Sequence, residues 1–217
     1  MSSVAIICSV MGLLLPWLDD PYQDLVVGPP GEAPYQVIQD AIEVAQDGDV
    51  ILVLPGTYVS ADGAAAAVVD FQGKALTLRA CGGPLVTRID GGGQIRGVVM
   101  GGTEAQQVAR LEGFSIVQGR TAKADLDGDG NIAPWEYRHG GGLVAFEGTV
   151  ELVDCQFVGN HATVHGGGAY IRNSTVTLTG CGFSDNRALD GEGGGLFQRF
   201  GEVMVTGGAF EDSRACF

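Results

Sequence analysis

The chain is poor in basic residues. Its 217 residues contain 12 Lys and Arg against 26 Asp and Glu, which gives a formal net charge of −14. This excess of negative charge repels phosphate backbones and anionic lipid headgroups, so we expect neither nucleic acid nor an anionic membrane surface as partner. It also disfavours polyanionic sugars, unless calcium bridges the two surfaces.

Other classes of protein are disfavoured by what the sequence lacks. The 36 glycines show no three-residue period, so they mark tight turns and not a collagen. The five cysteines include no Cys-x-x-Cys pair and no zinc-ligand spacing. The apolar run Val4–Leu15 is too short to span a bilayer. The basic residues that usually precede the apolar run of a secretory leader are missing. Residues 1–18 are therefore interpreted as a leader, a misassigned start or a buried first strand.

A repeat occupies the C-terminal half of the chain. Each copy begins with three glycines and an apolar residue, and a Phe-x-x-Asn or Phe-x-x-Ser motif follows. The copies begin at Gly140, Gly166 and Gly193. Their phenylalanines, Phe157, Phe183 and Phe210, are spaced by 26 and 27 residues. A fixed period of this length predicts a solenoid in which equivalent residues stack from coil to coil.

Each regular copy holds short stretches of strand character. In the first copy they cover 143–146, 150–153 and 155–158, with apolar and polar residues alternating. Alternation buries one face of a strand and exposes the other, which predicts an all-β fold, a parallel β-helix with three strands per coil and about five coils. The equivalent cysteines Cys155 and Cys181 are expected to stack in its core, with a disulfide between coils as the alternative.

The region before the repeats predicts a cap. Residues 34–46 carry apolar side chains at helical spacing, and Pro34 suits the first turn of a helix. An apolar strand is expected over 50–54, so the helix would cover the open end of the core. The expected organisation is a leader over 1–18, a linker over 19–33 and a β-helix domain over 34–217.

An acidic insertion interrupts the repeat. Ile116 and Phe157 hold equivalent positions but lie 41 residues apart, which leaves a surplus of about 15 residues. The surplus, placed over about 121–139, matches the calcium loop of EF-hands, where oxygen ligands recur at fixed positions around a glycine. Gly130 holds the glycine position.

The loop pattern predicts a Ca²⁺ site. Four carboxylates, a backbone carbonyl and a water together supply the six to eight oxygens that calcium prefers. In loop order the expected ligands are Asp125, Asp127, Asp129, Asn131 through its carbonyl, Ala133 through water, and Glu136 with both carboxylate oxygens. The alternative is an acidic surface turn without an ion. Because the flanks are too short for paired helices, we expect a single structural site.

Other polar residues recur near the turns. Asn160 and Asn186 end successive Phe-x-x-Asn motifs, and we expect them to stack as a ladder that bonds to the backbone. His161 and His165 flank the same turn without a cysteine or aspartate at ligand spacing, so they are expected to be solvated.

Two features resemble known families. Residues 39–58, QDAIEVAQDGDVILVLPGTY, resemble the N-terminal cap and first coil of pectin-lyase-like β-helix proteins. The glycine and Phe-x-x-Asn repeats resemble those of polymorphic outer membrane proteins, and the insertion is similar to the calcium loops of bacterial dockerins. Together the resemblances cover roughly residues 34–217 and imply a right-handed, single-stranded parallel β-helix with an N-terminal capping helix.

The resemblance leaves two functions open. One is a secreted or surface-exposed, calcium-stabilised scaffold that binds an extracellular polysaccharide or a surface protein. The other is a polysaccharide lyase or glycoside hydrolase, and lyases of this fold typically pair calcium with a basic side chain that removes a proton. Arg172 and Arg199 are candidates for that base, but no cluster of aspartates accompanies them in the repeats. The sequence therefore favours the non-catalytic scaffold, located outside the cell or at its surface.

Overall fold

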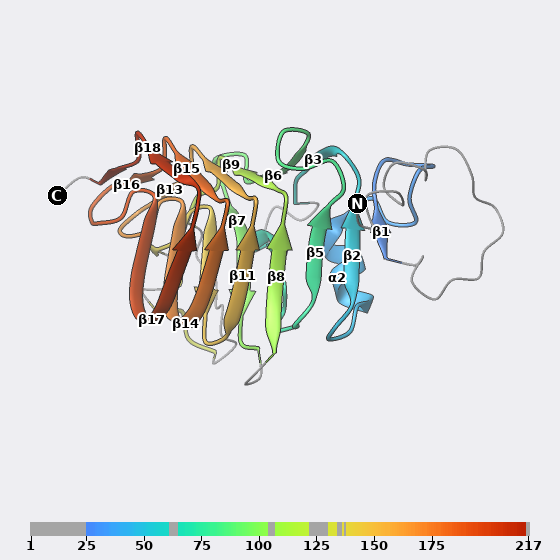
Figure 1. The fold of residues 1–217 in the computed structure, drawn as a ribbon, viewed down its shortest axis with the longest axis horizontal. Helices are drawn as coiled ribbons and strands as arrows, with labels where there is room; N and C mark the ends of the chain where they lie inside the picture. Colours follow the sequence, from blue (N-terminus) through green and yellow to red (C-terminus); the bar gives the residue numbers. More distant parts are fainter. Residues whose placement is uncertain are drawn as a thin grey trace.

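The chain folds into a parallel β-solenoid. The computed structural model describes residues 25–60, 65–103, 107–121, 130–133, 136 and 138–215. In these ranges successive coils stack along one axis, so that strands distant in sequence lie side by side (Figure 1). Every pairing between named strands is parallel. The predicted class, an all-β parallel solenoid, is confirmed.

Equivalent strands form three faces, which we name A, B and C. Face A consists of β4 (Ala67–Asp70), β7 (Arg96–Gly101), β10 (Leu143–Phe146) and the first parts of β14 (Ala169–Thr179) and β17 (Leu196–Thr206). Face B consists of β1 (Val26–Val27), β2 (Val50–Val53), β5 (Thr77–Ala80), β8 (Val108–Glu112), β11 (Thr149–Val153) and the second parts of β14 and β17. Face C consists of β3 (Gly56–Tyr58), β6 (Thr87–Asp90), β9 (Ser115–Val117), β12 (Gln156–Val158), β15 (Gly182–Ser184) and β18 (Ala209–Glu211).

The solenoid is longer than the repeat alone indicated. Face C has six strands within the described residues, so the chain makes about six turns where about five were expected. The N-terminal coils do not carry the full repeat of a glycine triplet followed by Phe-x-x-Asn, so the repeat period did not count them. The last coils also carry a fourth, two-residue strand, namely β13 (His161–Ala162), β16 (Arg187–Ala188) and β19 (Arg214–Ala215).

Faces A and B meet at a sharp corner. At this corner Glu147, Asn173 and Phe200 occupy one position of successive coils and have φ angles of 47°, 49° and 62°. Left-handed backbone turns the chain without ending the strand pairing, so β14 and β17 run through the corner as continuous strands. Asparagine tolerates this conformation better than most residues, whereas it is strained for phenylalanine.

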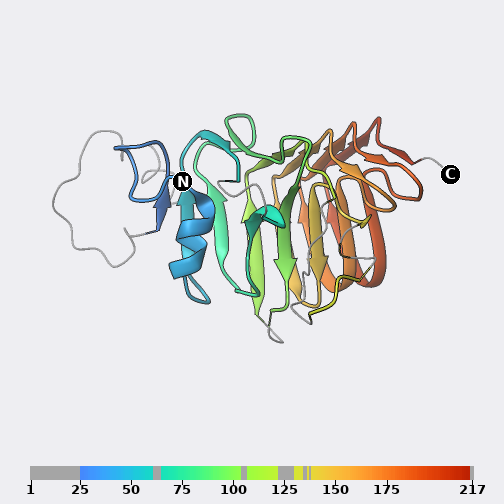
Figure 2. The same ribbon diagram turned by 180° about the vertical axis from the view of Figure 1, so that it is seen from behind.

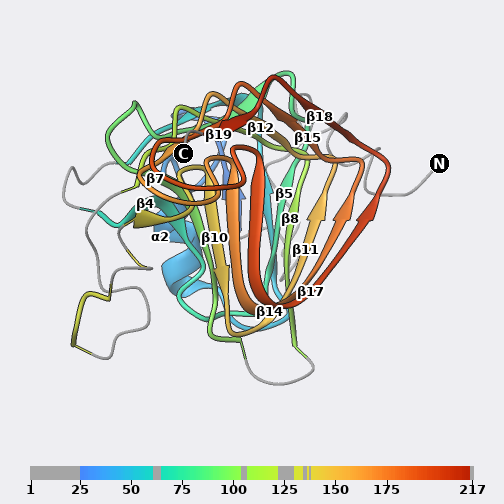
Figure 3. The ribbon, with the colours of Figure 1, turned by 90° about the vertical axis from the view of Figure 1, so that its left-hand side faces the viewer.

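The coils enclose the core, and Figure 3 shows their stacked outlines along the solenoid axis. The core side chains lie in register from coil to coil. Phe157 pairs with Ile116 on one side and Phe183 on the other, and Phe183 pairs with Phe210. The ring centroids are 4.7 Å apart in both phenylalanine pairs. The predicted register is therefore confirmed, although Phe210 in the last described coil is 52% exposed.

Two further predicted stacks are present. Asn160 and Asn186 are buried, and the side-chain amide of Asn160 donates to Oδ1 of Asn186 at 3.0 Å. Asn186 in turn donates to the carbonyl of Phe157 at 2.8 Å, as expected for a ladder within the turns. Cys155 and Cys181 are buried with free thiols, so they are core residues and the alternative of a disulfide between coils does not hold.

The N-terminal end differs from the other coils. Val26 and Val27, inside the expected linker, form β1 and pair with β2, because apolar β-branched residues suit a buried strand. Helix α2 (Ile38–Val44) packs beside β4 (Figure 2). The Gln39 side chain exchanges hydrogen bonds with the backbone of Asp70 at 2.9 and 3.1 Å, which satisfies part of the edge of face A. No helix in the described part of the chain is long and apolar enough to cross a membrane.

Candidate functional site

Both ends of the insertion bond to the same segment of the next coil, residues 161–165. Before it, Thr121 donates its N–H to the carbonyl of His161 at 3.2 Å. After it, the N–H of Gly140 donates to the carbonyl of His165 at 3.1 Å, and the Arg138 carbonyl accepts the N–H of Val164 at 2.8 Å. Both ends are therefore bound to the same neighbouring coil, which holds the two ends of the insertion together.

The expected calcium ligands are described only in part. Asp125, Asp127 and Asp129 lie outside the described residues, and no group of three His, Cys, Asp or Glu that could hold a metal occurs within them. Gly130 has a φ of 84°, the left-handed turn that the sixth position of a calcium loop uses. The sequence therefore remains the basis for the three aspartates as ligands.

The C-terminal part of the loop is described at residues 130–133 and at Glu136. Glu136 is buried and helical, and its carboxylate accepts the N–H of Ala133, so the acid points back into the loop. The N–H of Glu136 also donates to the carbonyl of Ala133 at 3.0 Å. Asn131 is exposed on the same segment.

Arg96 lies beneath the end of the insertion and was not predicted as a site residue. Its Nη2 donates to the carbonyls of Glu136 and His139 at 2.6 and 3.1 Å, and its Nε donates to that of Gly140 at 2.8 Å. The side chain has no exposed surface. Burial lowers the pKa of Arg96 to about 10, while the nearby charges of Asp70 and Glu136 oppose this change. The guanidinium therefore stays charged at neutral pH.

An aromatic cluster covers the outer side of face A next to Arg96. His139, at the end of the insertion, stacks on Tyr170 at 4.5 Å and on His165 at 5.0 Å. Phe197 stacks on His165 at 4.2 Å and on Tyr170 at 5.9 Å. His165 is therefore packed and not solvated as expected, whereas His161 is exposed. The sequence signal was available, because His139 and His165 both precede a glycine triplet.

Burial fixes the protonation state of His139, and both histidines accept main-chain hydrogen bonds. Nδ1 of His139 accepts the N–H of His165 at 3.1 Å, and Nδ1 of His165 accepts the N–H of Glu192 at 2.9 Å. Burial, followed by the charges of His165 and nearby arginines, lowers the pKa of His139 to about 4. A neutral His139 is required for the acceptor role, so both effects favour the same state at neutral pH.

Arg172 and Arg199 lie one above the other at the edge of this face. They are paired in register on β14 and β17, a closer alignment than the sequence indicated. Arg172 forms an ion pair with Glu147 at 3.3 Å. The guanidinium carbon of Arg199 lies 5.7 Å from the centre of the Phe200 ring. The two candidate bases thus share a row, with one carboxylate beside them.

Face B has a regular charged outer surface. Arg79 and Arg110 each contact Glu112 at 3.1 Å, and Arg110 also contacts Glu151 at 2.6 Å. These side chains come from three successive coils, and in each of two rows an arginine of one coil lies beside a glutamate of the next. The side chains are about a quarter to two-fifths exposed, and such pairs contribute little stability individually. The row presents a flat polar surface to solvent.

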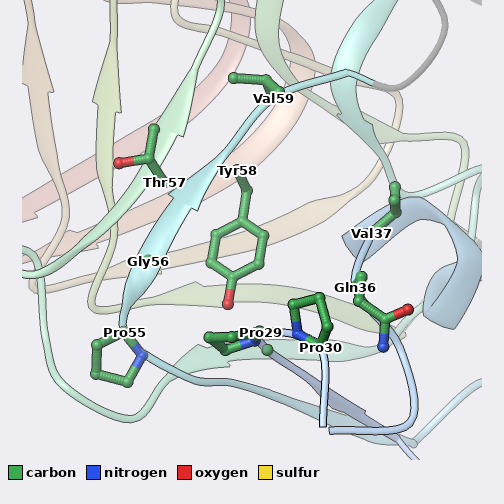
Figure 4. Close-up of a pocket in the computed structure, with 10 residues that line it drawn as sticks. Pro29, Pro30, Gln36, Val37, Pro55, Gly56, Thr57, Tyr58 and Val59 are labelled. Carbon is green, nitrogen blue, oxygen red and sulfur yellow. The ribbon is translucent and has the colours of Figure 1, made fainter. Parts of the chain in front are cut away.

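A shallow pocket lies near the N-terminal end. It has a volume of about 360 Å³, and Figure 4 shows the ring of Tyr58 among Pro29, Pro30 and Pro55. The Tyr58 hydroxyl donates to the carbonyl of Leu54 at 2.8 Å, and burial raises its pKa to about 12. The hydroxyl is therefore neutral and already bonded, so the pocket offers mainly carbon surface.

Comparison with known proteins adds a weak structural likeness. The chain matches no family model and no curated protein. It is similar to a solved structure of a pectin methylesterase mutant in complex with a hexasaccharide, with 12% sequence identity and a TM-score of 0.38. The match covers 82% of this chain and 66% of that one, so the chain spans just under two thirds of that protein. At this level of similarity we infer nothing about activity, and the fold assignment rests on the strand pairing.

Proposed function

We propose that this chain is a calcium-stabilised binding scaffold, located outside the cell or at its surface. The observation that carries the proposal is the fixed end of the insertion. Glu136 turns its carboxylate into the loop, while its carbonyl is bound by the buried Arg96. A loop held this way at both ends can bind an ion without a large loss of chain entropy.

Calcium would supply positive charge among four carboxylates, and the solenoid would supply the rigid frame. The ligands would be Asp125, Asp127, Asp129, the Asn131 carbonyl, a water next to Ala133, and Glu136. A single loop without a pair of flanking helices has no element to open, so the ion would stabilise the fold and not switch its shape. Weak, millimolar affinity is sufficient where calcium is plentiful, as it is outside cells.

An oxidising location has separate support. Cys81 is disulfide-bonded. Disulfides persist in extracellular and other oxidising compartments and are rare in the cytosol. The flat, charged surface of face B is suited to contact with an extended partner, for which we propose an extracellular polysaccharide or a surface protein.

Thermal unfolding with calcium or with chelator tests the calcium part of the proposal. Saturation at about one hundred times Kd should add about 2.7 kcal/mol to the free energy of unfolding. Asp125→Ala should abolish the difference, and Asp47→Ala, outside the insertion, should keep it. Calorimetry that detects no binding at millimolar calcium, together with unchanged melting, would reject a calcium site.

The binding role is tested on immobilised glycans. The protein should be retained by some extracellular polysaccharide, and charge reversal of Arg110 and Glu151 on face B should weaken retention. The alternative function, a lyase or glycoside hydrolase, has the Arg172–Arg199 row as its support. Release of unsaturated or reducing sugar ends from uronate polymers, lost in Arg199→Ala, would replace the scaffold proposal with that enzyme.

A further inference from the structure

Arg96 occupies a position of its coil at which the later coils have glycine. The N–H of Gly97 bonds to the carbonyl of Gly141, and Val98 pairs with Leu143, so Arg96 aligns with Gly141. The next two coils place Gly167 and Gly194 there. A Cβ at any of these three glycines would lie within 2.5 Å of a backbone oxygen later in the same coil, that of His161, Arg187 or Arg214. Of the aligned coils, the one that lies beside the insertion therefore has room for a side chain at this position, and the later ones do not.

The arginine binds one short segment of the insertion. Its three hydrogen bonds all go to main-chain carbonyls between Glu136 and Gly140, a stretch in which Glu136 and Arg138 are helical. The last carbonyls of a helix have no partner in the helix and carry partial negative charge, so a cation is favoured beside them. A buried charge is costly unless such partners exist. Arg96 and this segment therefore stabilise each other.

Glu136 is the residue through which this contact reaches the calcium loop. Its carbonyl accepts from Arg96, and its carboxylate, the expected bidentate ligand, accepts from Ala133 within the loop. If the arginine were absent, the main chain of Glu136 would lose its bond to face A. The main chain that sets the direction of this carboxylate would then be held less firmly.

We propose that Arg96 is a positioning residue for the calcium loop, which couples ion binding to the stability of the solenoid through the main chain of Glu136. This inference rests on the proposed function. Residues that orient metal ligands without touching the metal commonly change metal affinity by about 10- to 100-fold when replaced. Because coupling is reciprocal, calcium should also stabilise the strand that carries Arg96.

The test compares three variants of the full chain. Arg96→Met keeps the length of the side chain and removes every donor, and Arg96→Lys keeps one charged donor group. The control Lys74→Met removes a cation that also binds main-chain carbonyls, those of Ile42, Glu43 and Ala45, outside the insertion. Calcium Kd is measured by calorimetry, and terbium luminescence sensitised by Trp135, within the loop, gives a second readout. We expect about 10-fold weaker binding for Arg96→Met, a smaller loss for Arg96→Lys, and a Kd within about twofold of the wild type for Lys74→Met.

The outcomes separate this inference from the proposed function. If the wild type binds no calcium, the proposed function fails and the inference fails with it. If the wild type binds and Arg96→Met binds as tightly, only the inference is overturned, even where its melting temperature in chelator is lower. That second result would mean that Arg96 stabilises the fold without positioning the loop.

If neither Arg96 variant folds, hydrogen exchange on the wild type tests the inference. The amides of Gly97 and Val98 bond to the carbonyls of Gly141 and Gly142, next to the segment that Arg96 binds. Calcium should slow exchange at these amides more than at Leu178 on face B. Equal changes at both places, or none, would overturn the inference.

Discussion

Replacing Phe183 by alanine should destabilise the chain far more than the same change at Phe210. Phe183 is 1% exposed and has a parallel ring 4.7 Å away on both sides, at Phe157 and Phe210. Its removal forfeits the burial of the ring, opens a cavity and breaks two stacked contacts, which together cost about 3–5 kcal/mol. In a chain of this size that lowers the melting temperature by roughly 10 °C.

Phe210 is the matched control. It belongs to the same column and has the same chemistry, but it is 52% exposed and stacks on one side only. Phe210→Ala should therefore cost about 1–2 kcal/mol. Urea unfolding of both variants, followed by far-UV circular dichroism, measures the difference. Equal losses for the two variants, or no loss for Phe183→Ala, would refute the assignment of the column to the core.

Further predictions concern the insertion, a buried histidine and the corner between faces A and B. Deletion of residues 122–136 should leave a folded solenoid, because the flanking residues are bound to the same coil; loss of the strand signal in circular dichroism would contradict this. His139 has a pKa of about 4 in the folded chain against 6.5 as its usual value. Neutral His139 therefore contributes about 2–3 kcal/mol to the free energy of unfolding. This contribution is complete above pH 6.5 and is lost as pH falls toward about 4. His139→Asn keeps an acceptor near the position of Nδ1 but does not titrate, so its free energy of unfolding in urea should differ less between about pH 7.5 and about pH 5 than that of the wild type. An unchanged difference would mean that other groups cause the pH dependence. Phe200→Asn should raise the free energy of unfolding by about 0.5–1 kcal/mol, because asparagine relieves the left-handed strain and only a weak contact with Arg199 is lost. A lower stability in this variant would mean that the ring contact outweighs the strain.

The repeat allowed some contacts to be predicted residue by residue. In a parallel solenoid each coil aligns with the next, so a fixed period converts sequence spacing directly into spatial neighbours. The Phe157–Phe183 stack and the Asn160–Asn186 ladder followed from this rule alone. The rule applied less well upstream, where the coils do not carry the full repeat. The strand Val26–Val27 lies within the stretch expected to be a linker.

The site was predictable only as far as it is local. The calcium loop is a contiguous pattern, so its ligands could be named from sequence, although Asp125, Asp127 and Asp129 lie outside the described residues. Arg96 was missed because it precedes Glu136 by 40 residues and belongs to no repeat motif. His165 was misassigned to solvent because its partners, His139 and Phe197, reach it from neighbouring coils.

The sequence by itself determined the period, the register and the class of fold, because these depend on the regular recurrence of glycine and apolar residues. The tertiary structure decided what covers the outside of face A. There a histidine at the end of the insertion stacks on Tyr170, and Arg96 is buried beneath main-chain carbonyls. A charged residue becomes a buried one only when another segment brings it enough hydrogen-bond partners, and that depends on contacts across coils which no local pattern contains.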